Sequence, residues 1–274
     1  MSSLKSRVLV AVIGVPVLVA IVLWAPDVVI MVALALLAAI GGIELQQCVS
    51  GEKKSVLIGL SAVVAGLTVV CYYLWPQYAA MMVMAVVVLL FGYAIIKGGE
   101  VKFAQIMAGT FGSFAIGYSF ASFIRLEAYG LPRFHLLLPF ILSFACDTFA
   151  YIVGCSIGKH KLAPKVSPKK SVEGAIGGIL GNMFCGLLFV WVTNRWFVSS
   201  YFGYGEMALL ALLCSIAAQI GDLSFSLIKR EFGIKDYGKL FLAHGGVLDR
   251  FDSVLFVAPL MEIFLITMVK LFVG

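Results

Sequence analysis

The sequence predicts an all-α, polytopic membrane protein with about nine transmembrane helices and a cytoplasmic N-terminus. Of its 274 residues 62% are hydrophobic and only 12% are charged, which is more apolar surface than a soluble globule of this length could bury. The apolar runs are also long enough to cross about 30 Å of hydrocarbon at about 1.5 Å per residue. They begin near Val8, Val28, Val56, Tyr78, Phe103, Phe134, Ala175, Met207 and Ser253.

The first run follows Lys5-Ser-Arg7, a start that is also typical of a secretory signal. The run reaches Trp24 without a small-x-small cleavage site, and further apolar runs follow it. We therefore expect it to be kept as the first transmembrane helix.

Most of the later runs are separated by only a few residues, which leaves no room for a soluble domain. The exceptions are two loops of about 20 residues, at 155–173 and 229–252, which we expect to form the working surface. With the N-terminus inside, nine helices place 16 of the 20 lysines and arginines in the cytoplasm, as the positive-inside rule requires. We expect a packing region of five helices at 1–133 and a catalytic region of four helices at 134–274.

Cysteine and glycine spacing point to packing. The six cysteines show no C-x-x-C spacing and lie mostly in apolar runs, so neither a disulfide nor a zinc site is expected. The small residues of Gly109-Thr-Phe-Gly112 and of 174–181 recur at intervals that let neighbouring helices approach closely.

Polar residues inside the apolar runs are candidates for function because an ionised carboxylate is costly in hydrocarbon. Asp147, Asp222 and Asn182 each lie about 10–12 Å below the cytoplasmic end of their helices. They can line a polar cleft open to the cytoplasm, or form hydrogen bonds that only hold helices together, and both readings stay open for Asn182. The role of Glu262 is open between a structural pair and a proton-coupling acid, and Glu44, near an interface, is expected to be solvated.

Both long loops are suited to binding anions. Residues 158–174 carry five lysines and end in Glu173-Gly174 at a helix start, a combination suited to a polyphosphate or to anionic headgroups; ordinary positive-inside bias is the alternative. His160 looks incidental. The second loop contains His244-Gly245-Gly246 and then Asp249-Arg250-Phe-Asp252, in which acids could hold Mg²⁺ and a guanidinium could neutralise phosphate charge.

The second loop, from Ser226-x-x-Lys229-Arg230 through Lys235-Asp236 to Asp249-Arg-x-Asp252, resembles the C-terminal signature of phosphatidate cytidylyltransferases (CDP-diacylglycerol synthases). A second segment resembles the upstream motif of that family, from Asp147-x-x-Ala-Tyr151 through Gly158-Lys159 to Ser167-Pro-Lys-Lys170-Ser-x-Glu173-Gly174. The sharp similarity covers about 134–253. One departure is Leu242-Ala243, where the family usually has Pro-Gly before the histidine, and this puts the loop geometry in doubt.

The resemblance implies transfer of a cytidylyl group from CTP to phosphatidic acid, with release of pyrophosphate, in phospholipid biosynthesis. It implies Mg²⁺, alone or with a second cation, held by Asp222 and Asp249 with Asp147 or Asp252 nearby. The residues expected to act in catalysis are Asp147, Asp222, Lys229, His244, Asp249 and Arg250. Those expected to bind substrate are Lys159, Ser167, Lys169, Lys170, Glu173, Asn182, Ser226, Arg230, Lys235, Gly245 and Gly246.

Two other functions compete with this one. A transporter also uses buried acids and polar stripes, but no inverted repeat is visible; another CTP-using lipid enzyme, such as a polyprenol kinase, is the second alternative. The expected setting is the bacterial cytoplasmic (inner) membrane, with the active site facing the cytoplasm. The expected partners are CTP, phosphatidic acid and the bilayer, without a nucleic acid, and the choice between monomer and homodimer is open.

Overall fold

The computed structural model describes residues 14–196, 202–240 and 245–273. In these ranges, apolar helices occupy all nine predicted places. Seven are long and apolar enough to cross a membrane, and the described parts of the first and last, Gly14–Trp24 and Val254–Met268, are shorter. The predicted all-α membrane architecture is thus confirmed.

The chain divides into two compact units. The first unit comprises Met1–Tyr129 together with Glu231–Phe251, and the second comprises Gly130–Arg230 together with Asp252–Gly274. The segment 231–251 clusters with the N-terminal helices. The division into a packing region at 1–133 and a catalytic region at 134–274 stays a prediction.

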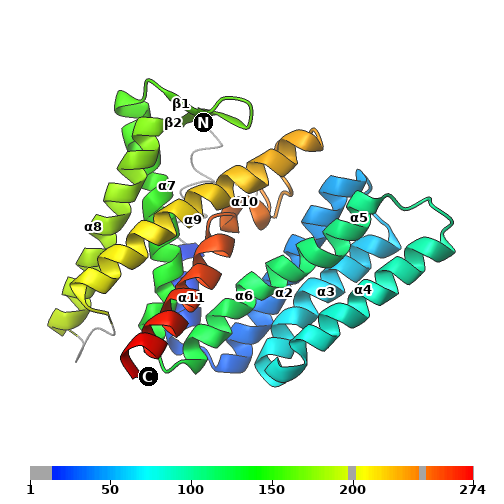
Figure 1. Cartoon of the computed structure of the whole chain (residues 1–274), viewed down its shortest axis with the longest axis horizontal. Helices are drawn as coiled ribbons and strands as arrows, with labels where there is room; N and C mark the ends of the chain where they lie inside the picture. Colours follow the sequence, from blue (N-terminus) through cyan, green and yellow to red (C-terminus); the bar gives the residue numbers. More distant parts are fainter. Residues whose placement is uncertain (1–13, 197–201, 241–244, 274) are drawn as a thin grey trace. The chain divides into compact units, whose positions relative to one another are not determined.

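The first unit is built around α2 (Asp27–Ser50), α3 (Val56–Leu74) and α6 (Ser113–Ala128), which pack on one another (Figure 1). Glycines allow these helices to cross closely. A Cβ atom on Gly42 would lie 2.7 Å from the Ser61 carbonyl oxygen, and one on Gly117 would lie 2.7 Å from Cβ of Thr68. Since real Cβ atoms do not approach so closely, the crossings require glycine.

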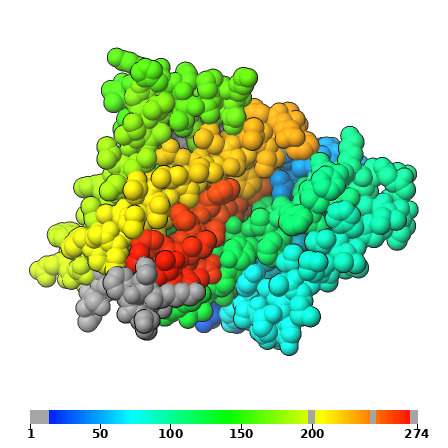
Figure 2. Space-filling view, viewed as in Figure 1, coloured from blue at the N-terminus to red at the C-terminus, as the bar shows by residue number. Residues whose placement is uncertain are grey.

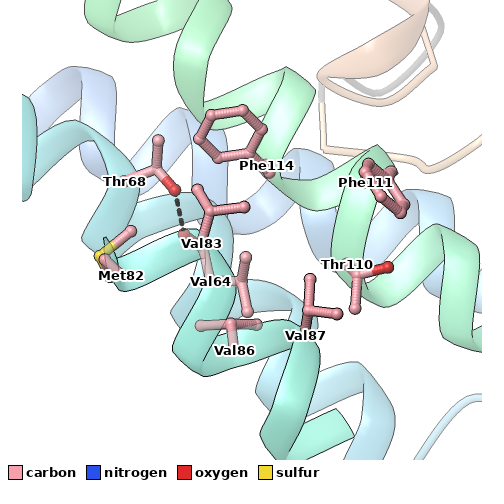
Figure 3. Close-up of a pocket in the computed structure, with 9 residues that line it drawn as sticks. All are labelled: Val64, Thr68, Met82, Val83, Val86, Val87, Thr110, Phe111 and Phe114. Atoms are coloured by element: carbon pink, nitrogen blue, oxygen red, sulfur yellow. Dashed lines mark hydrogen bonds between the residues drawn. The ribbon is translucent and has the colours of Figure 1, made fainter. Parts of the chain in front are cut away.

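Two further helices of the first unit join this bundle. They are α4 (Ala79–Ile96), which follows the short 3₁₀ turn Pro76–Tyr78, and α5 (Phe103–Met107), which continues into α6 through the π-helical segment Ala108–Gly112. An apolar pocket lies among α3, α4, the π-helical segment and α6, lined for example by Val64, Val87 and Phe114 (Figure 3). It has no ionisable side chain, so it does not supply a site for phosphate chemistry.

In the second unit α7 (Leu138–Ile157), preceded by a 3₁₀ turn at Arg133–Leu137, lies along α8 (Val172–Trp196) (Figure 1). The glycines of α8 make this possible, as their spacing predicted. A Cβ on Gly174 would lie 2.7 Å from the Ala150 carbonyl oxygen, and one on Gly178 would lie 3.0 Å from that of Cys146. The unit is completed by α9 (Tyr204–Glu231) and α11 (Val254–Val273).

The connection between α7 and α8 contains the one sheet in the described part of the chain. Strands β1 (Lys161–Ala163) and β2 (Ser167–Ser171) pair antiparallel, with Lys161 opposite Ser171. This hairpin lies at the adjacent ends of the two helices (Figure 1), and its green surface stands at the top of Figure 2. It was not predicted, because lysines and prolines disfavour strands. The alternation of a strand nevertheless gives consecutive lysines different surroundings.

Candidate functional site

Asp222 of α9 is paired with a lysine of the hairpin. The Nζ atom of Lys170 forms an ion pair with Oδ2 of Asp222, and the Ser226 hydroxyl lies 3.3 Å from Oδ1 of the same carboxylate. Ser226 is one helical turn beyond Asp222, so its position follows from the 3.6-residue period. The structure therefore brings together three residues that the sequence singled out separately.

Two further carboxylates lie in this part of the second unit. The hydroxyl of Ser253, just before α11, donates a hydrogen bond of 3.2 Å to Oδ2 of Asp147, and the Ser253 backbone N–H donates one of 2.8 Å to Oδ1 of Asp252. Burial, followed by the negative charges of Asp222 and Asp147, raises the pKa of Asp252 to about 8. Asp147, Asp222 and Asp252 are thus close enough to interact, and we call them the acidic cluster.

Close packing brings the three segments of the acidic cluster together. A Cβ on Gly221 would lie 2.5 Å from the Asp252 carbonyl oxygen and 2.9 Å from Cδ2 of Phe256. Glycine at this position therefore lets α9 approach the turn before α11. Lys229, two turns beyond Asp222, lowers the pKa of Asp252 in opposition to the acids. Both charge types expected for phosphate chemistry are present in the second unit.

The two lysines of β2 that the sequence treated alike differ in the structure. The side chain of Lys170 is 25% exposed and paired with Asp222, whereas Lys169 is exposed. Successive side chains on a strand point to opposite faces. Ser167 begins the same strand, and the exposed Arg230 of α9 donates from Nε to the Val166 carbonyl oxygen at 3.4 Å. Of these residues, only Lys170 reaches the acidic cluster by a described ion pair.

Glu173 organises the turn that leads into the hairpin. Its Oε2 atom accepts hydrogen bonds from the backbone N–H groups of Lys159, at 3.0 Å, and His160, at 3.2 Å. Its Oε1 atom lies 2.6 Å from Nδ1 of His160. The expectation that His160 is incidental is therefore wrong. The contacts of Glu173 support a role in holding the Gly158-Lys159 turn, while its predicted role in substrate binding stays a prediction.

Asn182 lies deep in the second unit and joins two helices. The side chain is fully buried, and its Nδ2 atom donates to the Ala211 carbonyl oxygen at 3.0 Å and to the Ser215 hydroxyl at 2.9 Å. These bonds from α8 to α9 support the structural reading that the sequence left open. Glu262 is also buried, within α11.

Asp249 belongs to the first unit, on the four-residue helix α10 (Leu248–Phe251). Its side chain is 8% exposed, and Oδ2 accepts hydrogen bonds from the backbone N–H groups of Tyr237, at 2.8 Å, and Gly246, at 3.0 Å. Lys235 and Arg250 are exposed, and His244 lies outside the described residues, as do Leu242 and Ala243. Because Asp222 and Asp249 belong to different units, their sharing of a metal stays a prediction.

Glu44 was expected to be solvated, and the structure shows that this is wrong. The side chain, on α2, is 5% exposed and accepts hydrogen bonds of 2.9 Å from the backbone N–H groups of Val247 and Leu248. Its partners lie about 200 residues later in the chain, so no local sequence pattern could indicate them. The one feature of the sequence that could have indicated a role for Glu44 is that it is an acid within an apolar helix.

The carboxylates have the donor chemistry that Mg²⁺ prefers, since Mg²⁺ takes oxygen ligands. In the described parts of the chain, no three His, Cys, Asp or Glu side chains are grouped closely enough to enclose a metal by themselves. Mg²⁺ is usually held by one or two carboxylates together with water and substrate phosphates. The acidic cluster fits a site of that open kind.

Comparison with known proteins agrees with these features. The curated relatives include the phosphatidate cytidylyltransferase of Staphylococcus haemolyticus, which is 42% identical over 153 residues that make up 56% of each chain. Another is the phosphatidate cytidylyltransferase of Staphylococcus aureus, which is 41% identical over 151 residues that make up 55% of each chain. The chain thus spans about half the length of the curated relatives it matches. The profile of the Cytidylyltransferase family matches residues 5–268, which is nearly the whole sequence. This protein belongs to the cytidylyltransferase family.

Proposed function

We propose that this protein is an enzyme that transfers the cytidylyl group of CTP to the phosphate of phosphatidic acid. A phosphate oxygen of the lipid attacks the α-phosphorus of CTP, the bond between the α-phosphorus and the bridging oxygen breaks, and pyrophosphate leaves. CDP-diacylglycerol stays in the membrane. Family membership and the names of the curated relatives support the reaction class.

The observation that carries the proposal is the acidic cluster, formed by α7, α9 and the turn before α11, with Lys170 and Lys229 beside it. Both substrates are anionic, so the site must suppress their repulsion before they can react. Lys170 and Lys229 supply positive charge for this purpose, and the exposed Lys169, Arg230 and Arg250 are further candidates for phosphate binding. The lipid phosphate is already ionised at neutral pH, so the reaction needs no general base from the protein.

One or two carboxylates of the acidic cluster would hold Mg²⁺ together with substrate phosphates, and Asp249 of the first unit is a further predicted ligand. The ion would supply charge neutralisation at the phosphates of CTP. The protein contributes by fixing the orientation of the carboxylates: Ser253 and Ser226 donate to Asp147 and Asp222, and backbone N–H groups donate to Asp249. Positioning of this kind carries a large share of catalysis in phosphoryl and nucleotidyl transfer.

The expected location is the bacterial cytoplasmic membrane, with the site on the cytoplasmic side. The two segments 155–173 and 229–252 together contain ten of the 20 lysines and arginines, and the positive-inside rule places such segments in the cytoplasm. CTP is available there. Phosphatidic acid would enter from the inner leaflet, where its headgroup meets the lysines at the helix ends.

The proposal is tested with purified protein in vesicles that contain phosphatidic acid. Incubation with cytidine-labelled CTP and Mg²⁺ should give labelled lipid, and omission of phosphatidic acid or addition of excess chelator should abolish it. Asp222→Asn should be inactive while purifying normally. Labelled CTP or lipid that crosses the vesicle membrane without forming a new product would instead identify a transporter.

A further inference from the structure

The carboxylate of Glu44 lies in the turn that carries Asp249. Its Oε1 atom accepts the Val247 N–H, and its Oε2 atom accepts the Leu248 N–H. Two glycines lie directly against it: a Cβ atom on Gly238 would lie 3.0 Å from Cδ of Glu44, and one on Gly246 would collide with the same carboxylate. Glu44 is therefore enclosed by the backbone of this turn.

Asp249 is fixed by the same turn. Its Oδ2 atom accepts the N–H groups of Gly246 and Tyr237, so the two carboxylates between them bind the N–H groups of three consecutive residues, Gly246 to Leu248. Gly245, with φ of 83°, begins the turn in a left-handed conformation that suits glycine. Displacement of Val247 or Leu248 would consequently move Gly246, which is bonded to Asp249.

Burial makes this arrangement specific. A carboxylate that is 5% exposed needs hydrogen-bond donors, and the backbone of the turn supplies them. Two acids in one turn also repel each other, which disfavours the arrangement unless the N–H groups point at the carboxylates. The turn and the two carboxylates therefore depend on one another, with Glu44 anchored in a long helix and Asp249 on a helix of only four residues.

We propose that Glu44 is a positioning residue for Asp249. It holds the backbone of 246–248 so that the Asp249 carboxylate is kept in a single orientation. The catalytic consequence of this inference rests on the proposed cytidylyl transfer. The effect of Glu44 on the order of the turn can be measured by hydrogen exchange, without any assay of activity. Glu44 itself is not expected to touch either substrate.

The test compares Glu44→Gln and Glu44→Ala with the wild type and with Glu52→Gln as the matched control. Glu52 is exposed, just after the same helix, so its replacement removes the same charge without entering the turn. Gln keeps the size of Glu44 and one acceptor oxygen, but its NH₂ group faces an N–H donor. We expect kcat to fall about tenfold or more in Glu44→Gln and further in Glu44→Ala, because hydrogen bonds to a charged group are lost.

Three further measurements separate positioning from a general loss of structure. The KM for CTP should stay within about twofold of wild type, since Glu44 does not bind the nucleotide. Hydrogen exchange in the intact, detergent-solubilised protein should rise at the amides of Gly246, Val247, Leu248 and Tyr237 and stay unchanged in α3 and α6. Glu52→Gln should match the wild type in each respect.

The outcomes decide two separate questions. The positioning role would be overturned if amide hydrogen exchange in the turn were unchanged in both Glu44 variants. It would also be overturned if amides throughout the first unit lost protection while kcat per folded molecule stayed unchanged. If the wild type makes no CDP-diacylglycerol, the proposed function fails. The exchange measurement then still shows whether Glu44 holds the turn.

Discussion

Replacement of Lys170 by alanine should damage activity far more than stability, and replacement of its neighbour Lys169 should do little to either. In the structure Lys170 forms an ion pair with Asp222, whereas Lys169 is exposed on the same strand. The two variants remove the same charge from adjacent positions. They form a matched pair that separates a site lysine from the ordinary positive charge of a cytoplasmic loop.

The expected magnitudes follow from the exposure of the pair. The side chains of Lys170 and Asp222 are 25% and 26% exposed, so the ion pair should contribute no more than about 1 kcal/mol to stability. For a chain of this size such a loss lowers Tm by at most about 4 °C. A charge-assisted hydrogen bond to a phosphate contributes about 1.5–3 kcal/mol, which corresponds to about a 10- to 150-fold loss in kcat/KM.

The assay measures labelled lipid formed from CTP and phosphatidic acid, and thermal unfolding of the same preparations in detergent. Lys170→Ala should lose kcat/KM by the stated factor, whereas Lys169→Ala should stay within about threefold of wild type. Equal effects of the two substitutions would refute the distinction drawn from the strand. A large fall in Tm with normal activity of the remaining folded protein would show that Lys170 has only a structural role.

Two further predictions concern the carboxylates. Asp222→Asn and Asp249→Asn should each abolish nearly all turnover. The double variant should lose little more activity than either single variant, because residues predicted to hold one ion act as a unit. Losses that multiply in the double variant would show that the two residues act separately. The pKa of Asp252 is raised to about 8 by burial and neighbouring acids. Between about pH 4 and pH 8 the folded protein therefore binds more protons than the unfolded chain. The free energy of unfolding, measured without metal, should consequently fall as pH rises through this window. Asp252→Asn should weaken that dependence in unfolding measurements; an unchanged slope would contradict the assignment.

Hydropathy and small-residue spacing were sufficient to predict the apolar helices of the described residues, seven of them long enough to cross a membrane, and the close packing of α7 and α8. Each of these features depends on residues that are near in sequence, or on a helix meeting lipid whatever its partners. The hairpin of β1 and β2 escaped prediction because its lysines and prolines are typical of loops. The hairpin joins two helices, and local propensity does not indicate that its strands pair.

The candidate site was predicted in its composition but not in its internal contacts. Depth along the helices placed Asp147 and Asp222 at one level, and the structure brings both into the acidic cluster. The sequence could not indicate that Lys170, and not Lys169, pairs with Asp222, because this depends on the alternation of side chains along a strand that was not predicted. Glu44 was misjudged because its partners, Val247 and Leu248, are separated from it by about 200 residues.

The most direct test of the proposed reaction follows two positions of the label in CTP. With purified protein, Mg²⁺ and phosphatidic acid, label in the α-phosphate should appear in the lipid product, and label in the γ-phosphate should leave in pyrophosphate in equal amount. Label from the γ-phosphate in the lipid would identify a lipid kinase and contradict cytidylyl transfer, and the absence of label in any lipid would contradict the proposed reaction altogether.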